Sequence, residues 1–387
     1  MDKVKPVSSG IGKKLLPVMA ISLVLIGISA YLYFQKQARL PNRPQEPEGP
    51  FQYHIEDVSF SNATANVTLS GTLTIPSNQS QKHPAVILIS GSGPQNRDGE
   101  WIGHKPFLVI ADQLTRQGVA VLRYDDRGFG KSTGDFHSGT SLDFSTDVES
   151  AIQFLKTRKE IDTKEIGLIG HSDGAMIAPM VAARSSDVSF IVMLAGPGIL
   201  VSELMVKRQE LLDRKAGKSE HEIQQSREYL EKLIKIIINS ENESGLRRAL
   251  EKFANETKDQ IPDEQVPAGM TKDEFISRQI AMLTSPFFKY CFTYDPRPTL
   301  QQVKCPVLAL NGDKDVQVPS EENLQAIKSG IASGGNNDVT IKELKDLNHM
   351  FQECTTGMID EYAKIDQTFS PLALDEISQW ILKRVKP

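Results

Sequence analysis

Cysteine is scarce in this sequence, and that scarcity limits the kinds of protein it can be. The 387 residues include three cysteines, Cys291, Cys305 and Cys354. Three cysteines cannot build a disulfide framework, although one pair could form a bridge, and none lies at the spacing of zinc ligands. Extremes of composition are also absent, since 39% of the residues are apolar and 24% are charged. These values exclude a disordered chain, a collagen-like chain and a polytopic membrane protein.

The sequence lacks a basic excess outside its first 50 residues. Residues 1–50 carry seven basic and three acidic side chains, a net charge of +4, so residues 51–387 carry −9 and the whole chain −5. Nucleic acids and anionic lipid surfaces are themselves negative and repel an acidic body. We therefore expect no nucleic acid among the partners of this protein.

A long uncharged run lies near the N-terminus. No residue between Lys14 and Lys36 is charged, and twenty residues from Leu15 to Phe34 are mostly apolar, enough to span about 30 Å of hydrocarbon as a helix. We predict a transmembrane signal anchor over residues 15–35, with residues 1–14 in the cytoplasm and the rest of the chain outside it. The alternative is a signal peptide cleaved near Ile28-Ser29-Ala30, which would give a secreted protein.

Prolines follow this run. Residues 40–50 contain four prolines, which favour extended geometry and cannot continue a helix. We interpret residues 36–50 as a linker and expect the folded body to begin near Phe51.

The remaining chain alternates strands with helices. Short apolar runs without polar interruption are typical of parallel strands that are covered on both faces, and helices between them indicate an open α/β sheet. The predicted strands are 54–60, 65–75, 85–89, 119–122, 166–169, 190–194, 306–310 and 339–341, the first two as an antiparallel pair. The predicted helices between and after them are 106–117, 143–159, 175–183, 320–331 and 374–385.

Residues 197–300 interrupt this alternation. The stretch has no strand-like run, and Ile223, Leu230, Leu233, Ile234 and Ile237 follow helical spacing. About 100 residues are too many for a connecting loop. We predict a helical cap over 197–300, inserted into an α/β core formed by 51–196 and 301–387.

The pentapeptide Gly170-His171-Ser172-Asp173-Gly174 has the pattern G-x-S-x-G. It follows a predicted strand and opens a predicted helix, the context of a nucleophile elbow, in which small residues permit a strained turn that exposes the serine hydroxyl. A glycine-rich turn with a capping serine is the alternative. Three further features favour the elbow.

Each feature follows a predicted strand. The glycine-rich segment 90–94 lacks the G-K-[ST] of a P-loop, and its backbone N–H groups, at Ser92 and Gly93, could form an oxyanion hole with that of Asp173. Asp315 follows the predicted strand 306–310, and His349 follows the predicted strand near 339–341. The order Ser172, Asp315, His349, each at the carboxyl end of a strand, is that of a hydrolase triad. We choose Asp315 over Asp313 because it lies deeper in its loop.

These motifs resemble the α/β-hydrolase superfamily across nearly all of residues 51–387. More narrowly, segments 91–99, 124–132 and 293–298 are similar to a group of capped bacterial serine carboxylesterases that also resemble serine aminopeptidases. The chain departs from that group at Asn96, commonly Asp, and at Asp173, commonly Glu. The Gly-x-x-Asp-x-x-Val-Pro spacing of the family, found at 312–319, also supports Asp315.

The resemblance implies a serine hydrolase that cleaves short-chain carboxylic esters through an acyl-enzyme and needs no metal or organic cofactor. Its partners would be a small-molecule ester and, through the N-terminal anchor, a membrane. Aminopeptidase and acyltransferase activities are alternatives on the same fold. A non-catalytic binding protein is the alternative from another class.

Overall fold

The computed structural model describes residues 43–78, 81–261, 263, 266–267 and 269–385. Within those ranges, no helix combines the length and the hydrophobicity that a membrane crossing requires. The predicted anchor at 15–35 and the predicted cytoplasmic segment at 1–14 lie outside the described residues.

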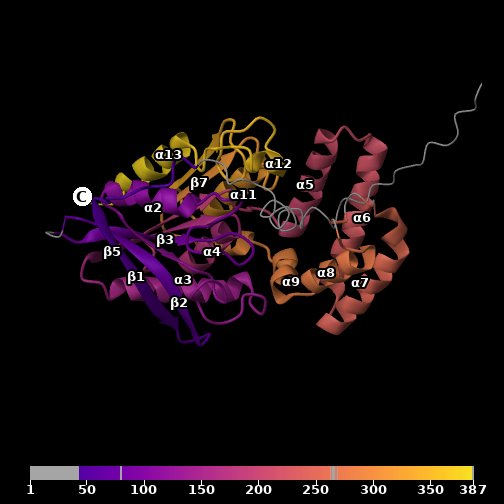
Figure 1. Cartoon of the computed structure of the whole chain (residues 1–387), viewed down its shortest axis with the longest axis horizontal. Coiled ribbons are helices and arrows are strands. Elements are labelled where there is room, and N and C mark those ends of the chain that lie inside the picture. The colour runs from indigo at the N-terminus through magenta and orange to yellow at the C-terminus, as the bar shows by residue number, and fades with distance from the viewer. Residues whose placement is uncertain (1–42, 79–80, 262, 264–265, 268, 386–387) are drawn as a thin grey trace, which may run out of the picture.

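Eight strands of the described chain form one twisted, mostly parallel sheet (Figure 1). They are β1 (Tyr53–Asn62), β2 (Val67–Pro76), β3 (His83–Ile89), β4 (Ala120–Tyr124), β5 (Ile161–His171), β6 (Phe190–Leu194), β7 (Val307–Gly312) and β8 (Val339–Leu344). Their order across the sheet is β1-β2-β4-β3-β5-β6-β7-β8. Strand β2 runs antiparallel to both of its neighbours, whereas β4, β3 and β5 to β8 are parallel.

The central strands are buried on both faces, as their apolar sequences predict. Every residue of β3, β4, β6 and β7 is buried. In β3, Ile87 and Ile89 belong to one hydrophobic cluster, and Val86 and Leu88 belong to another. Because alternate side chains of a strand point to opposite faces, these clusters are the two layers of core on either side of the sheet.

Helices cover both layers. Helices α2 (Pro106–Arg116) and α13 (Pro371–Leu382) pack into one cluster. Helices α3 (Ser141–Lys156), α4 (Asp173–Ala182) and α11 (Ser320–Ser333) pack into the other. The short helix α12 (Ile359–Tyr362) lies between β8 and α13. The predicted mostly parallel sheet with helices on both faces is confirmed.

The chain between β6 and β7 is helical and lies to one side of the sheet (Figure 1). Its elements are α5 (Val201–Lys215), α6 (Glu220–Asn239), α7 (Glu243–Thr257), the 3₁₀ turn η1 (Lys258–Gln260), α8 (Lys272–Leu283), α9 (Pro286–Thr293) and α10 (Arg297–Leu300). Ser219 and Thr271 cap α6 and α8 with capping boxes. The apolar stripe of α6 packs with α7, α8 and α9 in a hydrophobic cluster of its own. We call residues 201–300 the helical insertion.

The described part of the predicted linker is bound to the core. The Arg43 guanidinium donates hydrogen bonds to the carbonyls of Ile102, Gly103 and Ile365 at 2.9, 3.2 and 2.7 Å. The Gln45 side-chain oxygen accepts the N–H of Thr368 at 2.6 Å. The folded body therefore includes Arg43 and Gln45, upstream of the predicted start near Phe51. Proline content alone does not reveal this, since extended backbone leaves side chains available to bind a neighbouring surface.

Candidate active site

Ser172 occupies a strained turn between β5 and α4. Its backbone has φ of 55° and ψ of −114°, a conformation that a residue with a side chain rarely adopts and that costs on the order of 1–3 kcal/mol. Its N–H donates to the carbonyl of Leu194 at 2.8 Å, and its carbonyl accepts the N–H of Ala175 at 3.0 Å. These bonds fix the turn, and the Ser172 hydroxyl does not cap the helix. The hydroxyl is thereby presented to the pocket described below.

The two glycines of the pentapeptide are required by close approaches of backbone. A Cβ at Gly170 would lie 2.0 Å from the carbonyl oxygen of Gly174. A Cβ at Gly174 would lie 2.2 Å from the carbonyl oxygen of Ile89. Both distances are far below any tolerable contact with backbone, so the elbow can form only if these positions lack side chains. The predicted elbow geometry is present.

Asp315 and His349 meet through a short hydrogen bond. The distance between His349 Nδ1 and Asp315 Oδ2 is 2.7 Å, and both side chains are buried. The other carboxylate oxygen, Oδ1, accepts the N–H groups of Gln317 and Val318 at 2.8 and 2.9 Å. Asp313, by contrast, is exposed and accepts the N–H of Asp346 at 2.7 Å. The loop after β7 therefore directs Asp315, and not Asp313, to the histidine.

Two neighbours shape the loop that carries His349. The fully buried side chain of Asn348 accepts the N–H groups of Met350 and Gln352 at 2.9 and 3.0 Å. His171 Nε2 lies 2.9 Å from the His349 carbonyl, and since a carbonyl only accepts, Nε2 must carry the proton. Burial, together with the neighbouring His349, lowers the pKa of His171 to about 4. His171 therefore stays neutral near pH 7 and joins the elbow to the His349 loop.

The glycine-rich segment after β3 runs beside the elbow. A Cβ at Gly91 would lie 3.2 Å from Cβ of Ser172, so the Gly91 backbone passes close to the serine and leaves little room for a side chain. Ser92 and Gly93 line the same pocket as Ser172, and Gly93 has φ of 89°. Helix α4 begins at Asp173, so its N-terminus adds positive electrostatic potential beside the serine.

The side chain of Asp173 has surroundings that its sequence did not predict. It is buried, and Ser141 Oγ donates to its two oxygens at 2.9 and 3.2 Å. Burial raises the pKa of Asp173 to about 7, and the Ser141 hydrogen bond opposes this shift. Cys291 of α9 lies nearby, with 4.0 Å between its Sγ and Ser141 Oγ. Burial also raises the pKa of the Cys291 thiol well above its ordinary value, so this thiol is no rival nucleophile.

A pocket of about 1000 Å³ opens above Ser172, between the core and the helical insertion. Among the predicted site residues, Ser92, Gly93, Ser172, Asp173 and His349 line it, whereas Asp315 lies behind His349. Much of the wall is apolar and aromatic. It includes Phe136, Met176, Met282, Phe287, Phe288 and Phe292. Four of these residues belong to the helical insertion: Met282, Phe287, Phe288 and Phe292. They were not predicted, because helical spacing does not reveal which face of a helix meets the core.

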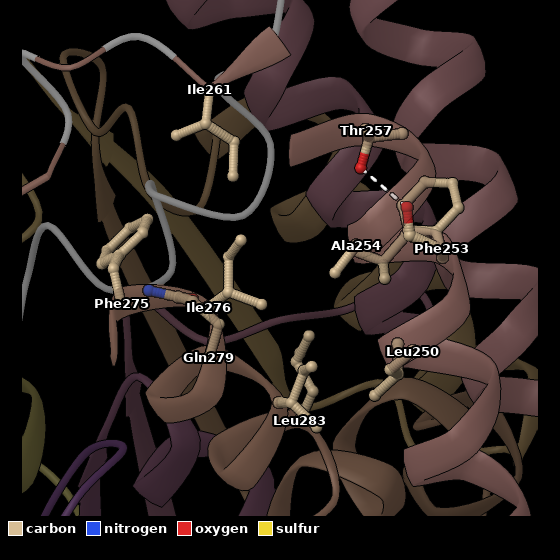
Figure 2. A pocket seen from close by; sticks show the side chains of 11 residues that line it. Leu250, Phe253, Ala254, Thr257, Ile261, Phe275, Ile276, Gln279 and Leu283 are labelled. Atoms are coloured by element: carbon tan, nitrogen blue, oxygen red, sulfur yellow. Dashed lines mark hydrogen bonds between the residues drawn. The ribbon is translucent and has the colours of Figure 1, made fainter. Parts of the chain in front are cut away.

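A second cavity lies within the insertion, between α7 and α8 (Figure 2). Its volume is about 20 Å³, enough for one water molecule. The lining is apolar apart from Thr257 and the buried Gln279. This cavity is too small for a substrate, and the reactive side chains lie in the larger pocket. In the described residues, moreover, no group of three or more His, Cys, Asp or Glu side chains is arranged to hold a metal ion.

Comparison with known families now identifies the chain. The model of a family described as serine aminopeptidase, S33, matches residues 105–353, nearly two thirds of the sequence. The chain belongs to this family of α/β hydrolases. The matched span contains Ser172, Asp315 and His349. The sequence-based prediction of an α/β hydrolase is thus confirmed, and the protein is an enzyme of that superfamily.

Relatives and solved structures agree with this assignment. Esterase EstD of Thermotoga maritima is 27% identical over 361 residues, which make up 92% of this chain and 74% of EstD. The esterase PF2001 of Pyrococcus furiosus is similar in structure with a TM-score of 0.52, at 16% identity over 90% of this chain and all of that one. The α/β hydrolase GrgF of a Penicillium species gives a TM-score of 0.52, at 16% identity over 86% of this chain and 99% of that one. At these identities the structural likeness concerns the fold alone.

Proposed function

We propose that this enzyme hydrolyses carboxylic esters through an acyl-enzyme formed on Ser172. The observation that carries the proposal is the junction of three elements at one pocket: the strained Ser172, the His349–Asp315 pair and the helix N-terminus at Asp173. The relative EstD, whose similarity covers 92% of this chain, is named an esterase, and this name supports the same activity.

The proposed mechanism assigns one task to each residue. Asp315 accepts the Nδ1–H of His349, which fixes the imidazole and leaves Nε2 as the unprotonated nitrogen. Nε2 removes the hydroxyl proton as Ser172 Oγ attacks the ester carbonyl. The negative oxygen of the tetrahedral intermediate is held by the backbone N–H groups of Ser92, Gly93 and Asp173.

Collapse of this intermediate completes the first half of the reaction. The bond between the acyl carbon and the alcohol oxygen breaks, and protonated His349 gives its proton to the departing alcohol. Water then attacks the acyl-serine by the same route, with His349 as base, and releases the acid. A buried Asp315 stabilises the imidazolium in both halves without taking the proton itself.

Short-chain acyl esters are the proposed substrates. A pocket of about 1000 Å³ is much larger than a short acyl group, so we assign the remaining aromatic space to the alcohol part of the ester. Apolar walls bind apolar groups by the hydrophobic effect, at about 25 cal/mol per Å² of surface removed from water. The preferred ester would then combine a short acyl group with a bulky apolar alcohol.

One experiment tests the activity and the chain-length preference together. Nitrophenyl esters of rising acyl length would be assayed with wild type and Ser172→Ala, and both proteins treated with a fluorophosphonate, which labels an activated serine. We expect hydrolysis that is fastest for short acyl groups, and labelling of wild type alone. Absence of both hydrolysis and labelling would favour the non-catalytic binding protein, and a preference for long chains would overturn the short-chain assignment.

Aminopeptidase activity is a second candidate, favoured by the description of the family. It needs an acidic group that binds the free amine of a peptide, and Glu100 lines the pocket. Aminoacyl anilides assayed beside the nitrophenyl esters separate the two, since a peptidase would cleave the anilides at comparable rates. Acyl transfer would appear in the same assay as ester formation when a second alcohol is added.

For the location of the enzyme we propose a membrane anchor at residues 15–35, with the catalytic body outside the cytoplasm. The apolar run and the prolines after it support this proposal. The full chain should sediment with membranes and resist carbonate extraction. A mature chain that starts near Tyr31, determined by mass spectrometry, would favour secretion after signal cleavage instead.

A further inference from the structure

The segment after β3 and the segment after β4 are joined through Asp126. Asp126 Oδ1 accepts the hydroxyl of Ser90 at 2.6 Å, and Oδ2 accepts the N–H of Gln95 at 2.8 Å. The N–H of Asp126 donates in turn to the Gln95 carbonyl at 3.1 Å. One residue thus holds both ends of the segment 90–95, across 36 and 31 residues of sequence.

Ser92 and Gly93 lie between the two held ends. Both line the pocket beside Ser172, and Gly93 has a left-handed backbone, with φ of 89°. Within the segment, the Gln95 side chain donates to the Ser92 carbonyl at 3.5 Å, which is a long and weak hydrogen bond. The directions of the Ser92 and Gly93 N–H groups therefore depend on how Asp126 fixes Ser90 and Gln95.

The neighbouring Asp125 has a different task. It accepts the N–H of Arg97 at 2.9 Å and its guanidinium at 2.8 and 3.1 Å, two residues past the end of the segment 90–95. Asp125 thus holds the chain just after the segment. Of the two consecutive aspartates after β4, only Asp126 binds both ends of the segment 90–95.

We propose that Asp126 is a positioning residue for ester hydrolysis, which aims the N–H groups of Ser92 and Gly93 at the developing oxyanion. The inference rests on the proposed function, because it assumes that these N–H groups act in the reaction. Donors aimed at the transition state raise kcat more than they tighten substrate binding, and loss of one such donor costs about 10²–10³ in kcat. If Asp126 no longer holds the segment 90–95, the enzyme should lose part of this factor in kcat.

Two variants of Asp126 separate positioning from charge. Asp126→Ala removes both accepted hydrogen bonds. Asp126→Asn keeps them, because its amide oxygen can accept the Gln95 N–H while its NH₂ donates to the Ser90 hydroxyl, which accepts as readily as it donates. Asp112→Ala is the matched control. Asp112 is a partly buried aspartate that accepts hydrogen bonds from Tyr53 and Arg116 at 2.8 Å each, on α2 and outside the pocket lining.

The assays measure kcat, KM and the affinity for a trifluoromethyl ketone, which forms a tetrahedral oxyanion adduct with an active serine. For Asp126→Ala we expect kcat to fall about tenfold to hundredfold and ketone affinity to fall by a similar factor, while KM changes less than about threefold. Asp126→Asn should stay within about threefold of wild type in all three, as should Asp112→Ala. If Asp126→Ala does not fold, Ser90→Ala, which removes one of the two bonds, should lower kcat about threefold to tenfold.

Several outcomes would overturn the inference. One is a folded Asp126→Ala variant whose kcat is within twofold of wild type. If Asp126→Ala does not fold, an unchanged kcat for Ser90→Ala would have the same meaning. A second is a fall in kcat for Asp126→Asn or Asp112→Ala as large as that for Asp126→Ala. A third is an Asp126→Ala variant in which KM rises but kcat and ketone affinity do not change. If Ser172→Ala retained wild-type activity, the proposed function itself would fail and this inference with it. A dead Ser172→Ala beside a fully active Asp126→Ala would reject the inference alone.

Discussion

Asp315 accepts a hydrogen bond from His349 across 34 residues of sequence, with 2.7 Å between Oδ2 and Nδ1. The carboxylate cannot turn away, because its second oxygen accepts two backbone N–H groups. An imidazole held in this way presents one nitrogen as a donor and keeps the other available as a base. This pair is the part of the site whose substitution has the clearest expected effect.

Asp315→Asn should therefore reduce kcat strongly, by up to about 10⁴ if the amide forces the wrong tautomer on His349. Asp313→Asn is the matched control, because Asp313 is an exposed aspartate of the same loop. In Asp313→Asn, kcat should fall by less than about tenfold. Steady-state kinetics of both variants, with folding checked by circular dichroism, make the comparison. A larger loss in the Asp313 variant would transfer the assignment to that residue.

Ser172→Ala should lower kcat by about a thousandfold or more and leave substrate affinity largely unchanged, because the hydroxyl contributes to bond formation and not to binding. Active-site titration with the fluorophosphonate provides an independent count of reactive serines. Ser185→Ala, which lies just beyond the end of α4, should behave as wild type. More than a tenth of wild-type activity in Ser172→Ala would remove this serine from the mechanism.

Gly170→Ala should destabilise the fold by about 3 kcal/mol or more, since its methyl group would meet the Gly174 carbonyl at 2.0 Å. Gly217→Ala separates this clash from backbone strain. Gly217 has φ of 75°, and a Cβ added there would meet no heavy atom within 4 Å, so its substitution should cost only about 1 kcal/mol. Urea unfolding of both variants measures the difference. A loss for Gly170→Ala no larger than that for Gly217→Ala would show that the Gly174 carbonyl can move aside and that the close approach does not require glycine.

His104 should make the free energy of unfolding depend on pH. Its ring is buried beside the Thr368 hydroxyl and the Tyr362 carbonyl, and burial lowers its pKa from 6.5 to about 4. Between these values the unfolded chain binds a proton at His104 and the folded chain does not. The free energy of unfolding must therefore fall as pH falls from about 6.5 to 4.

The comparison of wild type with His104→Gln isolates this effect. Other buried groups act as well: His171 in the same direction, and Asp173, whose pKa is raised, in the opposite direction. From pH 7 to pH 5, wild type should lose about 1–2 kcal/mol more than the variant in urea unfolding. Identical losses would mean that His104 has the same pKa in the folded and the unfolded chain.

The N-terminal boundary can be tested with two truncated chains. A chain that starts at Arg43 should be as stable as the body of the full protein, and active. One that starts at Phe51 lacks the Arg43 and Gln45 hydrogen bonds and should be less stable by about 2 kcal/mol, at about 1 kcal/mol or less per bond. Urea unfolding compares the two. Equal stability would mean that residues 43–50 contribute nothing to the fold.

Sequence reasoning reached the strands and the elbow because their causes are local. Unbroken apolar runs identify buried parallel strands, and glycines two residues either side of Ser172 identify a turn that needs close backbone approach. Asp315 was separable from Asp313 for the same reason, since the distance from the strand end decides which carboxylate turns inward.

Contacts set by sheet register could not be predicted in this way. The bonds of Asp126 to Ser90 and Gln95 depend on β4 lying parallel to β3, with Val86 paired to Val121. The bond from His171 to the His349 carbonyl spans 178 residues. Arg43 reaches Ile365 over 322 residues. No periodicity or composition encodes such pairs, because they arise only when distant segments are brought together by the whole fold.

The docking of Arg43 also supports one wall of the large pocket from outside. Its guanidinium binds the carbonyls of Ile102 and Gly103, next to Trp101, which lines the pocket. The same guanidinium binds the carbonyl of Ile365, so it ties two distant segments of the core together. A change at Arg43, which is not among the residues that line the pocket, would therefore be transmitted to the pocket wall through the backbone of residues 101–103.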